Sequence, residues 1–120
     1  MAKNNRKIED QKLECTQAIL PVKDALDVLN GRWKLQIIIS LYYENKRFNE
    51  ISKEVHGITD KVLSKELKDM ELNKLISRTV YDTFPPTVEY AITEHGRSLK
   101  KILVELSKWG LKHRKVILGK

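Results

Sequence analysis

The first half of the chain places its apolar residues at helical spacing. After Pro21, the apolar residues of 22–29 fall on one face, which predicts a helix with Pro21 in its first turn. Asn30 and Gly31 both tolerate a left-handed backbone and are expected to end this helix. Residues 32–43 are apolar almost all round, which predicts a second helix lying in the core.

Two shorter helical patterns follow, separated by a tight turn. Residues 48–55 form the first pattern and residues 60–72 the second, with 56–58 as the turn. Thr59 is expected to cap the second helix with its hydroxyl. The residues predicted to face inward on this second helix are Leu63, Leu67 and Met70.

The pattern then changes from a helical to an alternating period. Residues 75–81 are rich in β-branched and aromatic side chains, and 87–92 carry apolar side chains at every second position. The five residues 82–86 include two prolines and cannot continue a strand. A β-hairpin is therefore predicted.

A long helix is predicted over 94–118, capped by Thr93, with Gly110 as the candidate position of a break. Its apolar stripe consists of Leu99, Ile102, Leu103, Leu106 and Trp109. A chain of 120 residues has little core to cover such a stripe, and monomers avoid large exposed apolar patches. We therefore expect a dimer interface here; the alternative is packing against its own domain.

The order of these elements indicates the fold class. A short helix, a tight turn and a second helix make a helix-turn-helix unit, and a hairpin directly after it corresponds to a wing. The expected fold is mainly α with a small β-hairpin (α+β), a winged helix-turn-helix. Residues 1–12 are polar and are expected to be a flexible N-terminus, whereas 13–120 are expected to form a single domain.

The net charge of +7 points to a polyanionic partner, although a solvated basic protein without one is the alternative. The excess lies at the C-terminal end, since 94–120 holds eight Lys or Arg and two Glu. Residues 46–78 hold eight Lys or Arg and six acids. Net charge alone would therefore place a DNA-reading element at the C-terminal end. The position of that element has to be predicted from the pattern of apolar and polar residues instead.

The second helix of the unit carries cations on the face opposite its apolar residues. Because an α-helix fits the major groove of DNA, these cations can pair with phosphates or guanine acceptors; an ordinary solvated face is the alternative. Arg47 opens the first helix of the unit and can reach phosphate. Arg78, on the first strand, suits a backbone or minor-groove contact or an internal salt bridge. The residues expected to contact DNA from the second helix are Thr59, Lys61, Ser64, Lys65 and Lys68.

Several short motifs occur together and in order along residues 15–110. They are Gly31-x-Trp33, Arg47-Phe48-Asn49-Glu50, Gly57-Ile58-Thr59-x-Lys61-x-Leu63 and Val88-x-Tyr90-x-Ile92-Thr93-x-x-Gly96. In these motifs the chain closely resembles the HxlR-type regulators, winged-helix relatives of the MarR regulators. The resemblance implies a homodimeric bacterial transcription factor whose first and C-terminal helices form the dimer interface. It also implies a recognition helix over 59–72 and a wing over Arg78–Thr87, which adds Thr87 to the candidate DNA contacts.

Cys15 is the only cysteine, so no intramolecular disulfide is expected. Some HxlR-type regulators sense oxidants or electrophiles through one cysteine near the N-terminus, commonly directly before a proline. Here Leu20 precedes Pro21, and Cys15 lies six residues before that proline. An inert, packed cysteine is therefore favoured, and redox sensing by Cys15 is the alternative.

Catalysis, metal binding and cofactor binding are not expected, because the three histidines are scattered and no phosphate loop or nucleophile signature occurs. The N-terminus lacks an apolar signal-peptide core and no apolar run is long enough for a membrane span, which favours a cytoplasmic location. The expected function is sequence-specific binding of double-stranded DNA by a homodimeric regulator, a repressor on a pseudo-palindromic operator. The alternatives are a redox-responsive regulator and a non-specific architectural DNA-binding protein.

Overall fold

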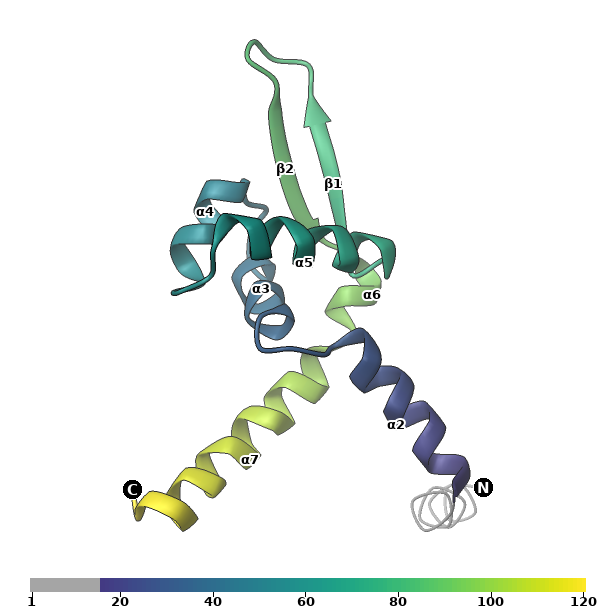
Figure 1. Cartoon of the computed structure of the whole chain (residues 1–120), viewed down its shortest axis with the longest axis vertical. Helices are drawn as coiled ribbons and strands as arrows, with labels where there is room; N and C mark the ends of the chain where they lie inside the picture. The colour runs from purple at the N-terminus through teal and green to yellow at the C-terminus, as the bar shows by residue number, and fades with distance from the viewer. Residues whose placement is uncertain (1–15) are drawn as a thin grey trace. The chain divides into compact units, whose positions relative to one another are not determined.

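The computed structural model describes residues 16–120, which divide into two units (Figure 1). The first unit reaches Gly31, and the second runs from Arg32 to Lys120. The flexible segment predicted over 1–12, and Cys15 with it, lies outside the described residues. The single domain expected over 13–120 stays a prediction.

The described part of the first unit contains one helix, α2, which spans Thr16–Val28. Pro21 lies inside this helix rather than in its first turn, so the predicted start is wrong. A proline inside a helix removes one backbone hydrogen bond, yet α2 continues through Pro21 to Val28. The end agrees with the prediction, since Gly31 has a left-handed φ of 81°.

Three helices form the body of the second unit: α3 spans Lys34–Leu41, α4 spans Phe48–Glu54, and α5 spans Asp60–Leu72. The bounds of α4 and α5 agree closely with the two predicted helices of the helix-turn-helix unit. α3 is shorter than the predicted 32–43. It ends early because the Tyr42 N–H donates to the Ile39 carbonyl at 3.2 Å, a tight bond that closes the last turn.

The core of the second unit lies between these helices and the base of the hairpin. Leu63, Leu67 and Met70 of α5 are almost fully buried, which confirms the predicted inward face. α3 is less uniformly buried than predicted, since Ile39 keeps 58% of its surface exposed. The largest fully buried side chains are Ile37, Ile38, Leu41, Ile51, Leu63, Leu67, Met70, Leu75 and Ile76.

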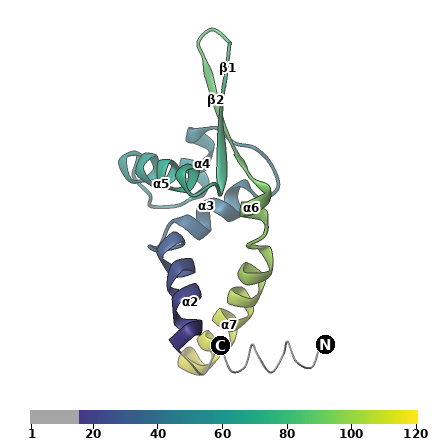
Figure 2. The ribbon, with the colours of Figure 1, turned by 90° about the vertical axis from the view of Figure 1, so that its right-hand side faces the viewer.

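The predicted hairpin is a two-stranded antiparallel sheet of β1 (Ile76–Tyr81) and β2 (Thr87–Ile92). Its register pairs Tyr81 with Thr87 across the loop. Lys46 pairs with the base of β2: its N–H donates to the Tyr90 carbonyl at 2.9 Å, and its carbonyl accepts from the Tyr90 N–H at 2.8 Å. The hairpin projects beyond α4 and α5 in both ribbon views (Figure 1, Figure 2).

The helix predicted over 94–118 is divided into α6 (Glu94–Arg97) and α7 (Lys100–Leu118). The break lies at Ser98–Leu99 and not at the predicted Gly110, which sits inside α7. The close packing of α6 at Gly96 explains the difference, because a Cβ there would lie only 2.3 Å from the Leu75 carbonyl oxygen. α6 is thus held against the start of the hairpin, and α7 resumes after one tight turn.

Candidate nucleic-acid interface

The turn between α4 and α5 is fixed by backbone conformation and by side-chain hydrogen bonds. Gly57 has a left-handed φ of 89°, which reverses the chain after α4. Thr59 caps α5 as predicted, since its hydroxyl oxygen accepts from the Val62 N–H at 3.2 Å. The Ser52 hydroxyl donates to the Asp60 carboxylate at 3.2 Å and ties the two helices together. The two helices therefore form a helix-turn-helix unit with a fixed turn.

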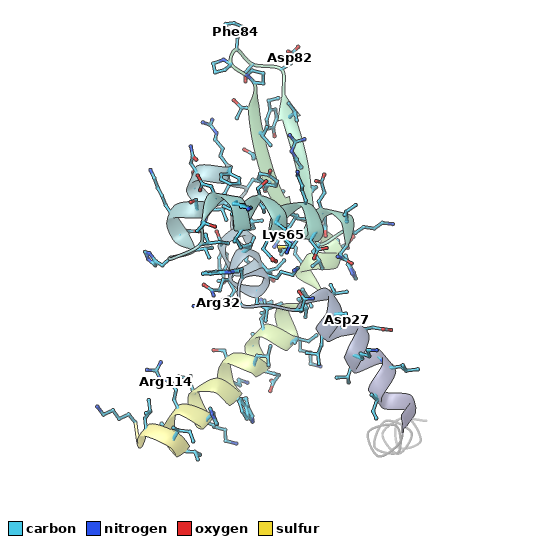
Figure 3. The ribbon with its side chains drawn as sticks, in the orientation of Figure 1. Asp27, Arg32, Lys65, Asp82, Phe84 and Arg114 are labelled. Carbon is cyan, nitrogen blue, oxygen red and sulfur yellow. The ribbon has the colours of Figure 1, made fainter. Side chains whose placement is uncertain are left out.

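The outward face of α5 carries three exposed lysines, Lys61, Lys65 and Lys68, which we call the lysine face. On a helix of 3.6 residues per turn they fall within an arc of about 60°. Ser64 lies beside them and is half-buried. Within the described part of the chain, none of the three ammonium groups has an ion-pair partner. Figure 3 labels Lys65 on α5. The lysine face is therefore available to an anionic ligand.

A buried lysine pairs with two acids on one flank of α5. The Lys34 Nζ lies 2.7 Å from Glu66 Oε2 and 3.0 Å from Asp69 Oδ2, and Lys34 is only 3% exposed. Burial alone lowers the pKa of Lys34, but hydrogen bonds and charge from the two carboxylates outweigh it and raise the pKa above its ordinary value. These two acids are thus paired with Lys34 of α3, whereas the ammonium groups of the lysine face have no ion-pair partner among residues 16–120.

A hollow of about 320 Å³ lies between α5 and the hairpin. Its lining residues are Ser64, Lys68, Glu71, Arg78 and Tyr90. Lys68 and Arg78 supply two cations, while Ser64 and Tyr90 supply two hydroxyl groups. Arg78 forms no salt bridge with any residue of 16–120, so the internal salt bridge considered for it is absent from that part of the chain. This chemistry suits an anion of phosphate type, with Glu71 as the one opposing charge.

Five predicted contact residues do not line this hollow: Arg47, Thr59, Lys61, Lys65 and Thr87. Arg47 is exposed directly before α4, where its N–H donates to the Glu50 carboxylate at 2.9 Å. Thr87 begins β2, and its hydroxyl lies 2.9 Å from the Thr83 hydroxyl across the hairpin loop. The structure thus brings Ser64, Lys68 and Arg78 to one hollow but does not bring Arg47 and Thr87 to it.

A second buried lysine joins the hairpin to the helices. The Lys46 Nζ donates to the Ser40 carbonyl at 2.6 Å and pairs with Glu54, which also accepts from the Ser40 hydroxyl at 2.6 Å. Hydrogen bonds from Lys46 and then Ser40 hold the pKa of Glu54 below its ordinary value. Because the Lys46 backbone pairs with Tyr90, this cluster fixes the base of the hairpin relative to α3 and α4.

The sequence pattern does not identify Lys34, Lys46 or Tyr90 as part of this site. Lys34 interrupts an apolar segment and Lys46 lies in a polar one, and since lysine side chains are usually exposed, neither position predicts an ion pair. Tyr90 lies opposite Arg78 in the hairpin register. The pairing of Tyr90 with Arg78 follows from counting residues outward from the five-residue loop. It is the one signal in the sequence that could have placed Tyr90 at this site.

The stripe predicted to form a dimer interface is largely uncovered within the second unit. Ile102, Leu106 and Trp109 keep 47%, 48% and 63% of their surface exposed, whereas Leu99 and Leu103 are half-buried. No residue of α7 is buried. The helix therefore contributes little to the core of its own unit. Among residues 16–120, no helix combines the length and the apolar character that crossing a bilayer requires.

Known proteins of one family match this chain over most of its length. The family model for HxlR-like helix-turn-helix proteins matches residues 28–117. The HTH-type transcriptional regulator YtcD of Bacillus subtilis (strain 168) is 38% identical over 100 residues, which cover 83% of this chain and 79% of YtcD.

Solved structures match the fold as well. The redox regulator HypR in its reduced form has a TM-score of 0.77 at 36% identity, covering 83% of this chain and 99% of HypR. A MarR-family transcriptional regulator of Enterococcus faecalis V583 has a TM-score of 0.72 at 32% identity, covering 88% of this chain and 94% of that protein. The fold is a winged helix-turn-helix, and the chain belongs to the HxlR-like helix-turn-helix family.

Proposed function

We propose that this protein is a sequence-specific DNA-binding transcription regulator, and not an enzyme, that acts in the cytoplasm as a homodimeric repressor. The observation that carries the proposal is the lysine face of α5, which is exposed and has no ion-pair partner among residues 16–120. Lys68 of this face shares a hollow with one further cation, Arg78. The names of its relatives support the same function, since YtcD is described as a transcriptional regulator.

The lysine face fits the major groove of DNA. A helix in that groove presents its first turns to base edges and phosphates, and Lys61 and Ser64 lie in those turns. Lys65 and Lys68 follow on the same face, and Lys68 lines the hollow beside the hairpin. Lys34 offsets part of the negative charge of Glu66 and Asp69, which reduces the repulsion between these acids and the phosphates that flank the groove.

The hollow between α5 and the hairpin suits one backbone phosphate of the same groove. Lys68 and Arg78 would neutralise its charge, and the hydroxyls of Ser64 and Tyr90 can donate hydrogen bonds to its oxygens. Contacts of this kind set the position of a protein on the duplex and carry no sequence information themselves. In this proposal Arg47, Thr59 and Thr87 contribute further contacts at the edges of the interface.

Selection of bound duplexes from a random DNA pool tests the proposal. A specific regulator is expected to enrich an inverted repeat with half-sites about one helical turn apart. It should bind that duplex at least about a thousandfold more tightly than random DNA, with strong dependence on salt. Equal affinity for both duplexes would instead support a non-specific architectural protein.

Lys65→Ala is expected to weaken binding to the selected duplex about tenfold. The number of ions released on binding, which the salt dependence of the affinity measures, should fall by about one. The reason is the loss of one exposed cation from the middle of the lysine face. Lys120→Ala, which removes the same charge from the C-terminal residue, is the matched control and should change affinity by less than about twofold. An unchanged affinity for a folded Lys65→Ala variant would remove Lys65 from the interface.

The α7 stripe supports a two-fold dimer, because Ile102, Leu106 and Trp109 are exposed and apolar. Leu103→Asp is expected to give a monomer at micromolar concentration, since it buries a charge in the proposed interface. Light scattering measures the mass, and circular dichroism checks the fold. Val104→Asp, about 100° away around the same helix, is the control and should remain dimeric. A dimeric Leu103→Asp protein would place the interface elsewhere.

A second candidate function is redox-responsive regulation through Cys15. The observation that favours it is the structural similarity to HypR, which is described as a redox regulator. The same binding measurement tests it, repeated after diamide treatment of the wild type and of Cys15→Ser. A loss of affinity in the wild type alone would support redox sensing, and an equal response of both proteins would oppose it.

A further inference from the structure

The tip of the hairpin presents one apolar cap to solvent. Phe84 is fully exposed, with a relative accessibility of 102%, and Pro85 and Pro86 beside it are exposed as well. Figure 3 shows Phe84 at one corner of the tip and Asp82 at the other. An aromatic ring at full exposure costs solvation free energy, so a folded protein gains from covering it.

The backbone that carries Phe84 is held by its own side chains. The Thr83 hydroxyl donates to the Pro85 carbonyl at 2.8 Å and lies 2.9 Å from the Thr87 hydroxyl. Each of the two prolines fixes its own φ angle. The ring is thus presented by a loop with few free dihedrals, which lowers the entropy lost when it enters a binding site.

The rest of the hairpin is tied to the body of the second unit. The Tyr81 hydroxyl donates to Glu89 at 3.1 Å, and Asn45 donates to the same carboxylate at 3.2 Å. The hydrogen bond to Glu89, and then the negative charge of Glu89, raise the pKa of the Tyr81 hydroxyl. Together with the backbone pairing of Lys46 and Tyr90, these bonds fix the direction in which the hairpin extends.

The length of the hairpin matches the distance between adjacent grooves. Six residues per strand extend about 20 Å at a rise of about 3.4 Å per residue. The major groove and the neighbouring minor groove are about 17 Å apart along the helix axis, half of one turn. With its base beside α5 in the major groove, the hairpin therefore places its tip at the next minor groove.

The chemistry of the tip selects what it can contact there. The segment 79–89 contains no Lys or Arg, and Asp82 and Glu89 are acidic. The tip consequently offers no ion pair to a phosphate, in contrast to Lys68 and Arg78 at the base. What it offers is an aromatic ring beside two prolines, the type of side chain that enters the minor groove between base steps.

We infer that Phe84 is an apolar wedge that enters the minor groove beside each half-site and partly unstacks one base step. The inference rests on the proposed function and adds to it a residue that determines specificity. A step that is easily unstacked, such as TA or CA, is favoured at this position, since unstacking costs less there. The regulator would thus read DNA deformability through the hairpin and base edges through α5.

The test uses the full-length protein and the duplex selected from the random pool, with 2-aminopurine replacing single adenines near the expected step. Wild-type protein should increase 2-aminopurine fluorescence at one step per half-site. Phe84→Ala should abolish that increase and weaken binding about tenfold. Phe84→Leu, which keeps an apolar wedge, should retain most of both effects. Tyr43→Ala removes a ring that is 90% exposed on the chain outside the hairpin and is the matched control, with affinity unchanged.

The outcomes separate this inference from the proposed function. If wild type selects no duplex, the proposed function fails and the wedge with it. If wild type and Phe84→Ala bind the selected duplex equally and give the same fluorescence, the wedge is overturned while the regulator stands. If Phe84→Ala instead changes the mass measured by light scattering, the ring covers a second copy of the chain, which also overturns the wedge.

Discussion

Gly96→Ala is expected to lower the free energy of unfolding by about 3 kcal/mol or more. The added Cβ would lie 2.3 Å from the Leu75 carbonyl oxygen and 2.8 Å from Ile92 Cγ1. The carbonyl cannot withdraw without losing the hydrogen bond from the Thr93 N–H, which is 3.0 Å long. Urea unfolding followed by circular dichroism measures the effect at a fixed protein concentration, because the stability of a dimer depends on concentration.

Gly110→Ala is the matched control, since it makes the same substitution on the next helix. No atom lies within 4 Å of a Cβ at Gly110, and alanine is favoured over glycine inside a helix by up to about 1 kcal/mol. This variant should therefore be as stable as the wild type or more stable. A Gly96→Ala protein that unfolds at the same urea concentration as the wild type would contradict the close approach of α6 to Leu75.

The two glycines also show where sequence reasoning reaches its limit. In the sequence, Gly110 lies in the middle of a long helical pattern and is the natural candidate for a break, whereas Gly96 lies near its start. The break occurs after Gly96 because α6 packs on Leu75. Leu75 precedes the hairpin in the sequence, whereas Gly96 follows it. No local pattern encodes that contact, so the position of the break was not predictable.

α5 was predictable because each of its features is local. Thr59 marks its start, and the 3.6-residue period places Leu63, Leu67 and Met70 inward and the lysine face outward. The hairpin was predictable for the same reason, since two alternating segments flank a loop rich in proline.

The electrostatic setting of the site was not predictable from local features. Lys34 and its partners Glu66 and Asp69 lie on two different predicted helices with a third helix between them in the sequence, and only the packing of α3 against α5 brings them together. The hollow was not predictable either, because its lining depends on the angle between α5 and the hairpin as well as on the register of the hairpin. Residue spacing therefore identified the cations of the site. It did not show which lysines form ion pairs with acidic residues and which have no such partner.

Lys34→Met is expected to lower the free energy of unfolding by about 3 kcal/mol. Methionine matches the lysine side chain up to Cε and lacks only the ammonium group, which leaves Glu66 and Asp69 without their cation. The Glu66 side chain is only 14% exposed, so water replaces the lost partner poorly there. Asp69 is 47% exposed and loses less, which keeps the effect at the lower end of the range for broken buried pairs.

The matched control is Lys108→Met, which removes a lysine from an exposed pair with Glu105, 3.7 Å apart. Such pairs contribute little, and this variant should stay within about 0.5 kcal/mol of the wild type. Equal stability of the Lys34→Met and Lys108→Met proteins would show that the buried pair contributes no more than the exposed one.

The pH dependence of the Lys34→Met effect separates loss of charge from loss of packing. The pKa of Lys34 is raised in the folded state, so the stability that its charge contributes is fully present below the ordinary pKa of 10.5 and is lost as pH rises through the folded pKa. The difference between wild type and Lys34→Met should thus be constant from neutral pH to about pH 9 and shrink only above the ordinary pKa. A difference that persists unchanged at higher pH would assign the effect to packing.

Because unpaired Glu66 and Asp69 would also stand on the flank of α5, the folded Lys34→Met protein should bind the selected duplex more weakly than the wild type.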